Sequence, residues 1–155
     1  MMENTEQQEL QTTATFTAPL VLIWEAWTDP EKVVNWWGPD GFTTTIHEMD
    51  FREGGEWNLT LHGPTGTNYP NRSSYREIIP LKKIVFEHFN PHFIASILFE
   101  SKEGGTEIQW NMLFDSPEQF DIIVKAHKAD EGQKQTIERL QNYIQQLIDE
   151  GKFQN

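Results

Sequence analysis

The feature that most constrains the fold of this chain is an amphipathic pattern near its C-terminal end, over residues 130–151. Apolar residues recur there at helical spacing, while charged and amide side chains occupy the other positions. The apolar positions are Ile137, Leu140, Ile144, Leu147 and Ile148. Asp130 is predicted as the N-cap, with Gln133 at the capping-box position, and Gly151 as a left-handed C-cap. Because one face of this helix must be buried, the rest of the chain has to cover it.

Seven strand-like runs lie upstream of this helix. They span residues 10–17, 42–51, 56–62, 69–79, 84–89, 93–100 and 106–114. The runs alternate apolar with polar residues, and Gly- or Pro-containing turns separate most of them, which predicts an antiparallel meander. Each such strand has one apolar face that must be buried, and we expect the C-terminal helix to pack against these faces. Between a curved sheet and a single helix we expect a gap as well as a core, and that gap suits a ligand.

Two short helices are predicted between the first and second strands. The first follows Pro19 and carries apolar residues at helical spacing through Trp27, and the second begins at Asp29 and ends before Gly38. A further helix begins at Ser116, just before the C-terminal one. This order predicts an α+β domain with its helices on one side of an antiparallel sheet.

The length of 155 residues suits one domain. We expect it to span residues 10–151, between disordered tails at residues 1–9 and 152–155. The start of the chain is polar and acidic, unlike a signal peptide, and no segment is apolar enough to span a bilayer. These observations predict a cytoplasmic protein.

The charge balance restricts the classes of partner. Twelve Lys and Arg residues oppose 24 Asp and Glu residues, and the resulting net charge of −12 repels phosphate backbones and anionic lipid surfaces. We therefore expect neither nucleic acid nor a membrane as a partner. The chain has no cysteine, which excludes disulfides, thiolate metal ligands and cysteine catalysis.

A series of short motifs runs through nearly the whole chain after Leu10. They occupy residues 24–30, 36–39, 41–43, 48–57 and 75–78, followed by Gly132, Leu140 and Tyr143. In this order they resemble the activator of heat-shock protein 90 ATPase homologue-like family, within the START-like (SRPBCC) helix-grip superfamily. The resemblance implies a seven-stranded curved antiparallel sheet that grips the C-terminal helix around an apolar cavity. It implies no catalytic residues.

Three functional classes stay open at this point, because the superfamily implied by the resemblance includes carriers, enzymes and chaperone-activating domains, and a fold does not fix a function. The leading hypothesis is non-enzymatic binding of a small apolar or aromatic molecule between the sheet and the C-terminal helix. The alternatives are an interaction module that regulates a chaperone or another protein, and a cyclase- or hydrolase-like enzyme that uses the same cavity.

The predicted cavity wall combines apolar side chains with a few polar ones. Core packing is the commoner role of a single tryptophan, but Trp57 and Trp110 lie on the apolar sides of their strands and are the better candidates for a cavity wall. The hydroxyls of Tyr69 and Tyr75 can orient a ligand, and His88 is either a ligand contact or a hydrogen-bonded core histidine. The predicted ligand-binding residues are Trp57, Leu59, Leu61, Tyr69, Tyr75, Phe86, His88, Ile108, Trp110, Met112, Phe120, Ile137, Leu140 and Ile144.

No metal, cofactor or catalytic residue is expected. His88 and His92 flank a turn without an adjacent carboxylate or a third histidine, and a metal site needs three or four convergent ligands. Glu48, Asp50 and Arg52 share one face of a strand, which favours surface ion pairs over acid–base chemistry. The chain lacks a nucleophile elbow, a phosphate-binding loop and a dinucleotide fingerprint.

Overall fold

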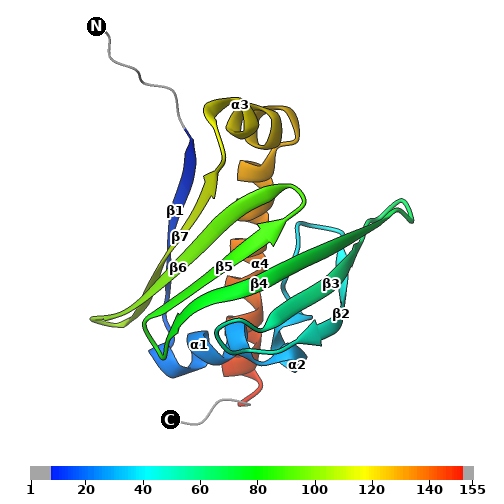
Figure 1. Ribbon diagram of the computed structural model, residues 1–155. Helices are drawn as coiled ribbons and strands as arrows, with labels where there is room; N and C mark the ends of the chain where they lie inside the picture. Colours follow the sequence, from blue (N-terminus) through cyan, green and yellow to red (C-terminus); the bar gives the residue numbers. More distant parts are fainter. Residues whose placement is uncertain (1–7, 152–155) are drawn as a thin grey trace, which may run out of the picture.

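The computed structural model describes residues 8–151 (Figure 1). The strands are β1 (Glu9–Phe16), β2 (Thr43–Met49), β3 (Glu56–His62), β4 (Asn68–Ile79), β5 (Lys83–Phe89), β6 (His92–Lys102) and β7 (Gly105–Phe114). The helices are α1 (Leu20–Thr28), α2 (Pro30–Val33), α3 (Pro117–Phe120), the π-helical turn η1 (Asp121–Ala126) and α4 (Ala129–Asp149). The predicted order of elements is confirmed.

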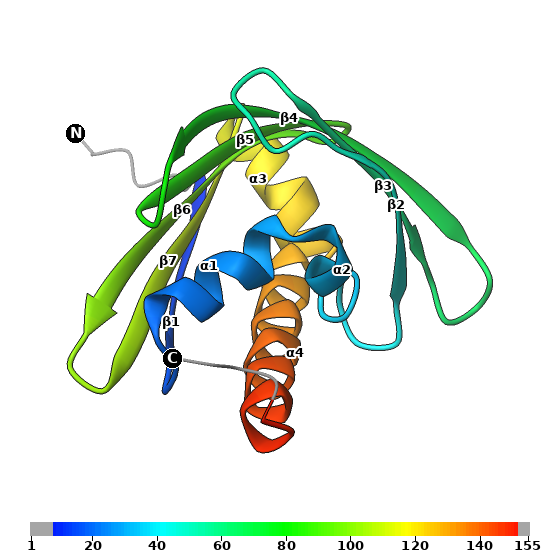
Figure 2. The same cartoon turned by 90° about the horizontal axis from the view of Figure 1, so that it is seen from below.

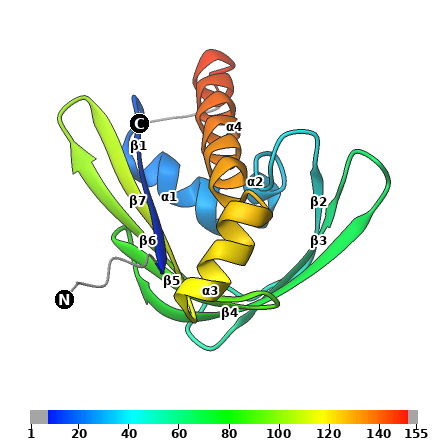
Figure 3. The ribbon, with the colours of Figure 1, turned by 90° about the horizontal axis from the view of Figure 1, so that it is seen from above.

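The seven strands form one antiparallel sheet in the order β1-β7-β6-β5-β4-β3-β2. From β2 to β7 the chain is a meander, as predicted, and β1 closes the order by pairing with the last strand. Figures 2 and 3 show the sheet curving into an open trough around α1, α2 and α4. This is the predicted α+β, helix-grip arrangement, with the long C-terminal helix packed on the concave face of the sheet.

The pairing of β1 with β7 depends on a very close approach of two backbones. A Cβ atom at Gly105 would lie 1.9 Å from the carbonyl oxygen of Phe16, so only glycine fits there. Next to it, the Thr106 hydroxyl donates a 2.7 Å hydrogen bond to the Ala18 carbonyl, which ties β7 to the start of α1. The β6–β7 hairpin therefore positions the first helix as well as the first strand.

The N-terminus of α4 differs from the prediction. Lys128, in the left-handed conformation with φ 60°, precedes the helix, and Asp130 lies in its first turn, where its charge suits the helix dipole. Gln133 does not form a capping box but is buried against the sheet. Its Oε1 accepts a 2.5 Å hydrogen bond from the Thr12 hydroxyl. The C-terminal prediction is correct, since Gly151 follows the helix with φ 68°.

The segment between β7 and α4 also differs in detail. Ser116 caps α3 as predicted, and its Oγ accepts a hydrogen bond from the Gln119 amide at 3.1 Å. The single helix expected here is a short α-helix followed by the π-helical turn η1, which buries Val124.

Two residues of the predicted N-terminal tail, Gln8 and Glu9, are described, and Glu9 belongs to β1. Gln8 already bonds to β7, because its side-chain amide donates to the Phe114 carbonyl at 2.9 Å and its own carbonyl accepts from the Phe114 amide at 3.0 Å. The rest of the predicted tails, residues 1–7 and 152–155, lies outside the described residues. Within residues 8–151, no helix is both long and apolar enough to cross a membrane.

Candidate functional site

The concave face of the sheet carries most of the predicted wall. Eleven of the fourteen predicted residues are buried: Trp57, Leu59, Tyr75, Phe86, His88, Ile108, Trp110, Phe120, Ile137, Leu140 and Ile144. Leu61 and Met112 are partly buried and pack against this core. Tyr69 is the exception, with 47% of its surface exposed at the rim. The structure thus brings together the strand and helix residues that the sequence pattern selected.

The residue at the centre of this wall is Trp37, which sequence reasoning did not select. Its ring centroid lies 4.9 Å from that of Trp57, 5.6 Å from Trp110 and 5.7 Å from Trp27. The half-buried Trp37 ring therefore fills the space between β3 and β7 that was predicted to hold a ligand. Its neighbour Trp36 is fully buried and donates to the Ala26 carbonyl at 3.0 Å. The paired tryptophans were a visible signal, but their pattern did not tell which ring faces the sheet.

Trp37 begins a short segment, residues 37–42, that we call the strap. One guanidinium nitrogen of Arg139 on α4 donates to the carbonyls of Gly38 and Pro39, at 2.8 and 3.0 Å. The Asp40 amide donates to Gln135, also on α4, at 3.1 Å. Gly38 has φ 108°, a conformation that favours glycine. Side chains of α4 therefore hold the strap, while its glycine permits the sharp change of direction after Trp37.

An open pocket of about 490 Å³ lies beside the strap. This mouth pocket is lined by Pro39, Phe42, Leu61, Asn68, Tyr69, Pro70, Asn71, Asn90 and Pro91. Its lining carries no charged residue, in a chain with a net charge of −12. Phe42 and Tyr69 place their rings 5.8 Å apart at its rim. The mouth pocket includes two predicted residues, Leu61 and Tyr69.

His88 lies behind the mouth pocket and is held on both sides. Its Nδ1 donates to the Pro91 carbonyl at 2.7 Å, and its Nε2 lies 2.6 Å from Oδ1 of Asn71. The ring stacks on Phe93, with centroids 4.6 Å apart. Burial lowers the pKa of His88, against the opposing effect of the bond to Pro91, and nearby His92 lowers it further. These contacts are those of a hydrogen-bonded core histidine, and its role toward a ligand stays a prediction.

The wall also contains buried polar groups without partners. The indole N–H groups of Trp27, Trp57 and Trp110 and the hydroxyl of Tyr75 find no hydrogen-bond partner among residues 8–151. Burial raises the pKa of Tyr75 well above its ordinary value, so the phenol keeps its proton. An unsatisfied buried group of this kind costs about 1–3 kcal/mol. Four of them in one region point to a functional role for that region.

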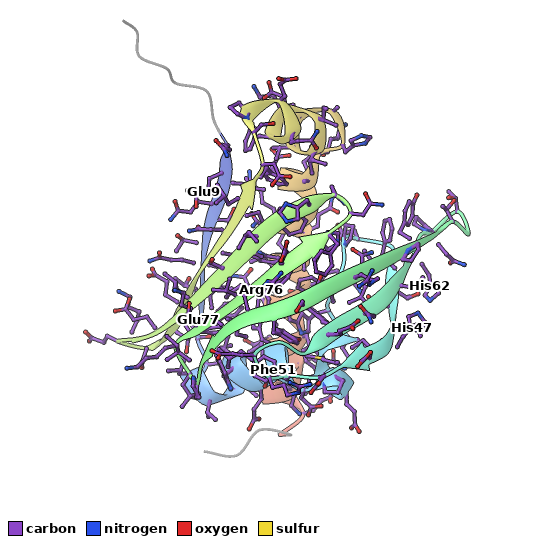
Figure 4. All side chains as sticks on the ribbon, in the orientation of Figure 1. Glu9, His47, Phe51, His62, Arg76 and Glu77 are labelled. Atoms are coloured by element: carbon purple, nitrogen blue, oxygen red, sulfur yellow. The ribbon has the colours of Figure 1, made fainter. Side chains whose placement is uncertain are left out.

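His92 has neighbours that the sequence did not reveal. Its Nε2 lies 2.6 Å from Oε2 of Glu87, and its Nδ1 lies 2.6 Å from Oδ1 of Asp115. Arg76, on the convex side of the sheet in Figure 4, pairs with the same Glu87. The expectation that no carboxylate lies beside this histidine was wrong. Glu87 lies on β5, His92 on β6 and Asp115 directly after β7, so only the pairing of these strands brings the three together.

The described residues nevertheless include no group of three or more side chains placed to hold a metal ion. The two carboxylates beside His92 approach opposite ring nitrogens, so they do not converge on one point. Asp50 and Arg52 form an exposed ion pair at 2.8 Å beyond the end of β2, in agreement with the surface interpretation of that motif.

Together the trough-shaped sheet, the gripping helix and the aromatic, uncharged wall define a helix-grip domain of the SRPBCC type. The chain belongs to the family described as activator of Hsp90 ATPase homolog 1-like protein, whose model matches residues 17–145. The resemblance drawn from the motifs is thereby confirmed.

Solved structures show the same fold. A protein of Arthrobacter aurescens is 22% identical with a TM-score of 0.85, over 94% of this chain and 90% of that one. A protein of Nitrosomonas europaea is 20% identical with a TM-score of 0.82, over 94% and 99%. A protein of Aeromonas hydrophila described as AHSA1-like is 18% identical with a TM-score of 0.70, over 95% and 96%. A search of curated proteins finds no match.

Proposed function

We propose that the protein binds a small apolar or aromatic molecule between the concave face of the sheet and α4, without catalysing a reaction. The observation that carries the proposal is the uncharged mouth pocket beside the strap. Its volume of about 490 Å³ falls in the range of ligand sites, roughly 300–1,000 Å³, and its lining is mainly apolar and aromatic with a few amide groups.

The inner face of β3 connects this pocket with the aromatic wall. Leu61 lines the pocket, and Leu59 and Trp57 follow on the same face of the strand because side chains alternate along it. Trp57 in turn touches the Trp37 ring. A ligand that advances along β3 therefore meets Trp37, and we propose that it takes the place of this ring when the strap moves.

Filling the pocket tests this proposal. Leu61→Trp adds a large ring at a partly buried position of the lining, where overpacking is less severe than in the core. Leu98→Trp is the matched control, since Leu98 is 38% exposed and lies outside the mouth pocket. Benzophenone serves as the probe, because it is aromatic, neutral and forms covalent adducts on irradiation.

We expect benzophenone to raise the Tm of the parent and of the Leu98→Trp variant in step with its concentration, as mass action requires. Leu61→Trp should lose at least tenfold in affinity, and adducts in the parent should map to the strap and to β3. If Leu61→Trp binds benzophenone as tightly as the parent does, the molecule does not enter through this pocket and the proposed site is wrong.

A further inference from the structure

We infer that the ligand of this site is a neutral molecule carrying acceptor oxygens, of the ketone, quinone or ether class, rather than a hydrocarbon or a carboxylate. This inference rests on the proposed function and adds the chemical class of the ligand. It comes from the hydrogen-bonding character of the buried side-chain groups that lack partners.

The unpartnered groups of the concave side can all donate a hydrogen bond. They are three indole N–H groups, which cannot accept, and the protonated hydroxyl of Tyr75. The other two unpartnered buried atoms are the side-chain oxygens of Asn58 and Asn111. These residues directly follow Trp57 and Trp110 along β3 and β7, so strand alternation places them on the convex side. The unpartnered groups of the concave wall therefore offer four donors, of which only the Tyr75 hydroxyl can also accept.

Three of the four donor-bearing rings contact a single side chain, and the fourth stacks on one of the three. The Trp37 ring contacts Trp27, Trp57 and Trp110, and the Tyr75 ring stacks on that of Trp57 with centroids 5.7 Å apart. Trp37 has no acceptor atom in its side chain, so it fills the space without satisfying any of these groups. A molecule of similar size with acceptor oxygens would fill the same space and pair with the donors as well.

The charges around the wall exclude an anionic ligand on physical grounds. The donors of the wall, three indoles and the Tyr75 phenol, are all uncharged, and the Arg139 guanidinium donates to carbonyls of the strap. Burial lowers the pKa of His88, which disfavours a charge on its imidazole. A carboxylate would therefore be buried without a counter-ion in a protein of net charge −12, which is strongly unfavourable.

Three diphenyl compounds of similar shape separate these classes. Benzophenone carries a carbonyl, diphenylmethane carries a methylene at the same place, and diphenylacetate carries a carboxylate. We expect benzophenone to bind the parent protein about tenfold more tightly than diphenylmethane, because one hydrogen bond to a buried donor is worth about 1.4 kcal/mol in that difference. Diphenylacetate should bind more weakly than either. Calorimetric titration measures all three affinities.

Two variants assign the effect to the buried donors. Tyr75→Phe keeps the stacked ring and removes only the hydroxyl, so the preference for benzophenone over diphenylmethane should shrink by severalfold while the affinity for diphenylmethane stays the same. Tyr143→Phe is the control, because this half-buried tyrosine lies on α4 outside the wall and its hydroxyl accepts from Asn35 at 3.4 Å. It should keep the full preference.

The indole N–H resonances report the contact directly. In a ¹⁵N-resolved spectrum, benzophenone should move the signal of Trp57 or Trp110 in the direction of hydrogen bonding, and diphenylmethane should move neither. Equal binding of all three compounds, or an unchanged preference in Tyr75→Phe, overturns the ligand class and leaves the proposed site standing. If none of the three compounds binds, the proposed function falls as well.

Discussion

Two regions of the concave face differ in whether their polar side chains have hydrogen-bond partners. Along the seam where β1 and β7 meet α4, the polar side chains of Thr12, Gln133 and Thr106 have partners: Thr12 bonds Gln133, Gln133 bonds the Trp110 carbonyl at 3.4 Å, and Thr106 bonds the Ala18 carbonyl. Around Trp37, the indoles of Trp27, Trp57 and Trp110 and the Tyr75 phenol have none among residues 8–151. The comparison suggests that hydrogen bonds are completed where the elements must be held together and left open where a ligand can complete them.

Removing α4 should have the largest effect, since it abolishes both regions. A chain that ends at Asp130 leaves the inner faces of the strands open to water. We expect it to be insoluble or to lose cooperative unfolding and near-ultraviolet dichroism. A truncated chain that still unfolds cooperatively would contradict the helix-grip account of its stability.

Trp36 has a hydrogen-bond partner, and its neighbour Trp37 lies among the unpartnered donors. Substituting each of these adjacent residues therefore compares the two situations. Trp36→Ala removes a fully buried ring and its bond to Ala26, and we expect it to lower the free energy of unfolding by about 4 kcal/mol. Trp37→Ala removes a half-buried ring and should cost about 2 kcal/mol while increasing the affinity for benzophenone. Chemical denaturation and calorimetry measure both quantities. Equal losses with no gain in binding would show that Trp37 is an ordinary core residue.

Substitutions at two glycines test how closely β1 approaches β7 at the seam. Gly105→Ala forces a methyl group against the Phe16 carbonyl and should destabilise the protein by about 3 kcal/mol. Gly132→Ala is its control, since the added methyl group would meet only Pro39, at an ordinary 4.0 Å, inside a helix where alanine is favoured. This change should stabilise by about 0.5–1 kcal/mol. A neutral Gly105→Ala variant would mean that β1 does not approach β7 this closely.

Protonation of His88, which lies behind the mouth pocket, should have the smallest effect on stability. Burial lowers its pKa in the folded protein, so the unfolded chain binds a proton more readily. Stability is then complete above the unfolded pKa of about 6.5 and decreases as the pH falls below it, toward the lower folded pKa. Urea unfolding at several pH values should show this decrease in the parent, and His88→Gln should reduce the slope. Parallel pH profiles for the two proteins would argue against a buried, neutral imidazole.

The sequence could predict some residues of the candidate site but not others. The residues of β3 and β7 that face α4, such as Trp57 and Trp110, were predictable because side chains alternate along a strand and the apolar set must be covered. Their contact with a ligand remains a prediction. Trp37 was not selected, since it lies after a helix in an irregular segment, where no period tells which way a ring points.

The sequence by itself determined the order of elements, the antiparallel meander, the long gripping helix and its end at Gly151. These features follow from local periodicity and from turn and cap chemistry, which act between residues a few positions apart. Only the tertiary structure decided that Gln133 serves the seam instead of a capping box, that Glu87 and Asp115 meet at His92, and that the donors of the wall lack partners. The physical reason is that each of these outcomes depends on the distance between atoms far apart in the chain, which only the curvature of the sheet and the packing of α4 set.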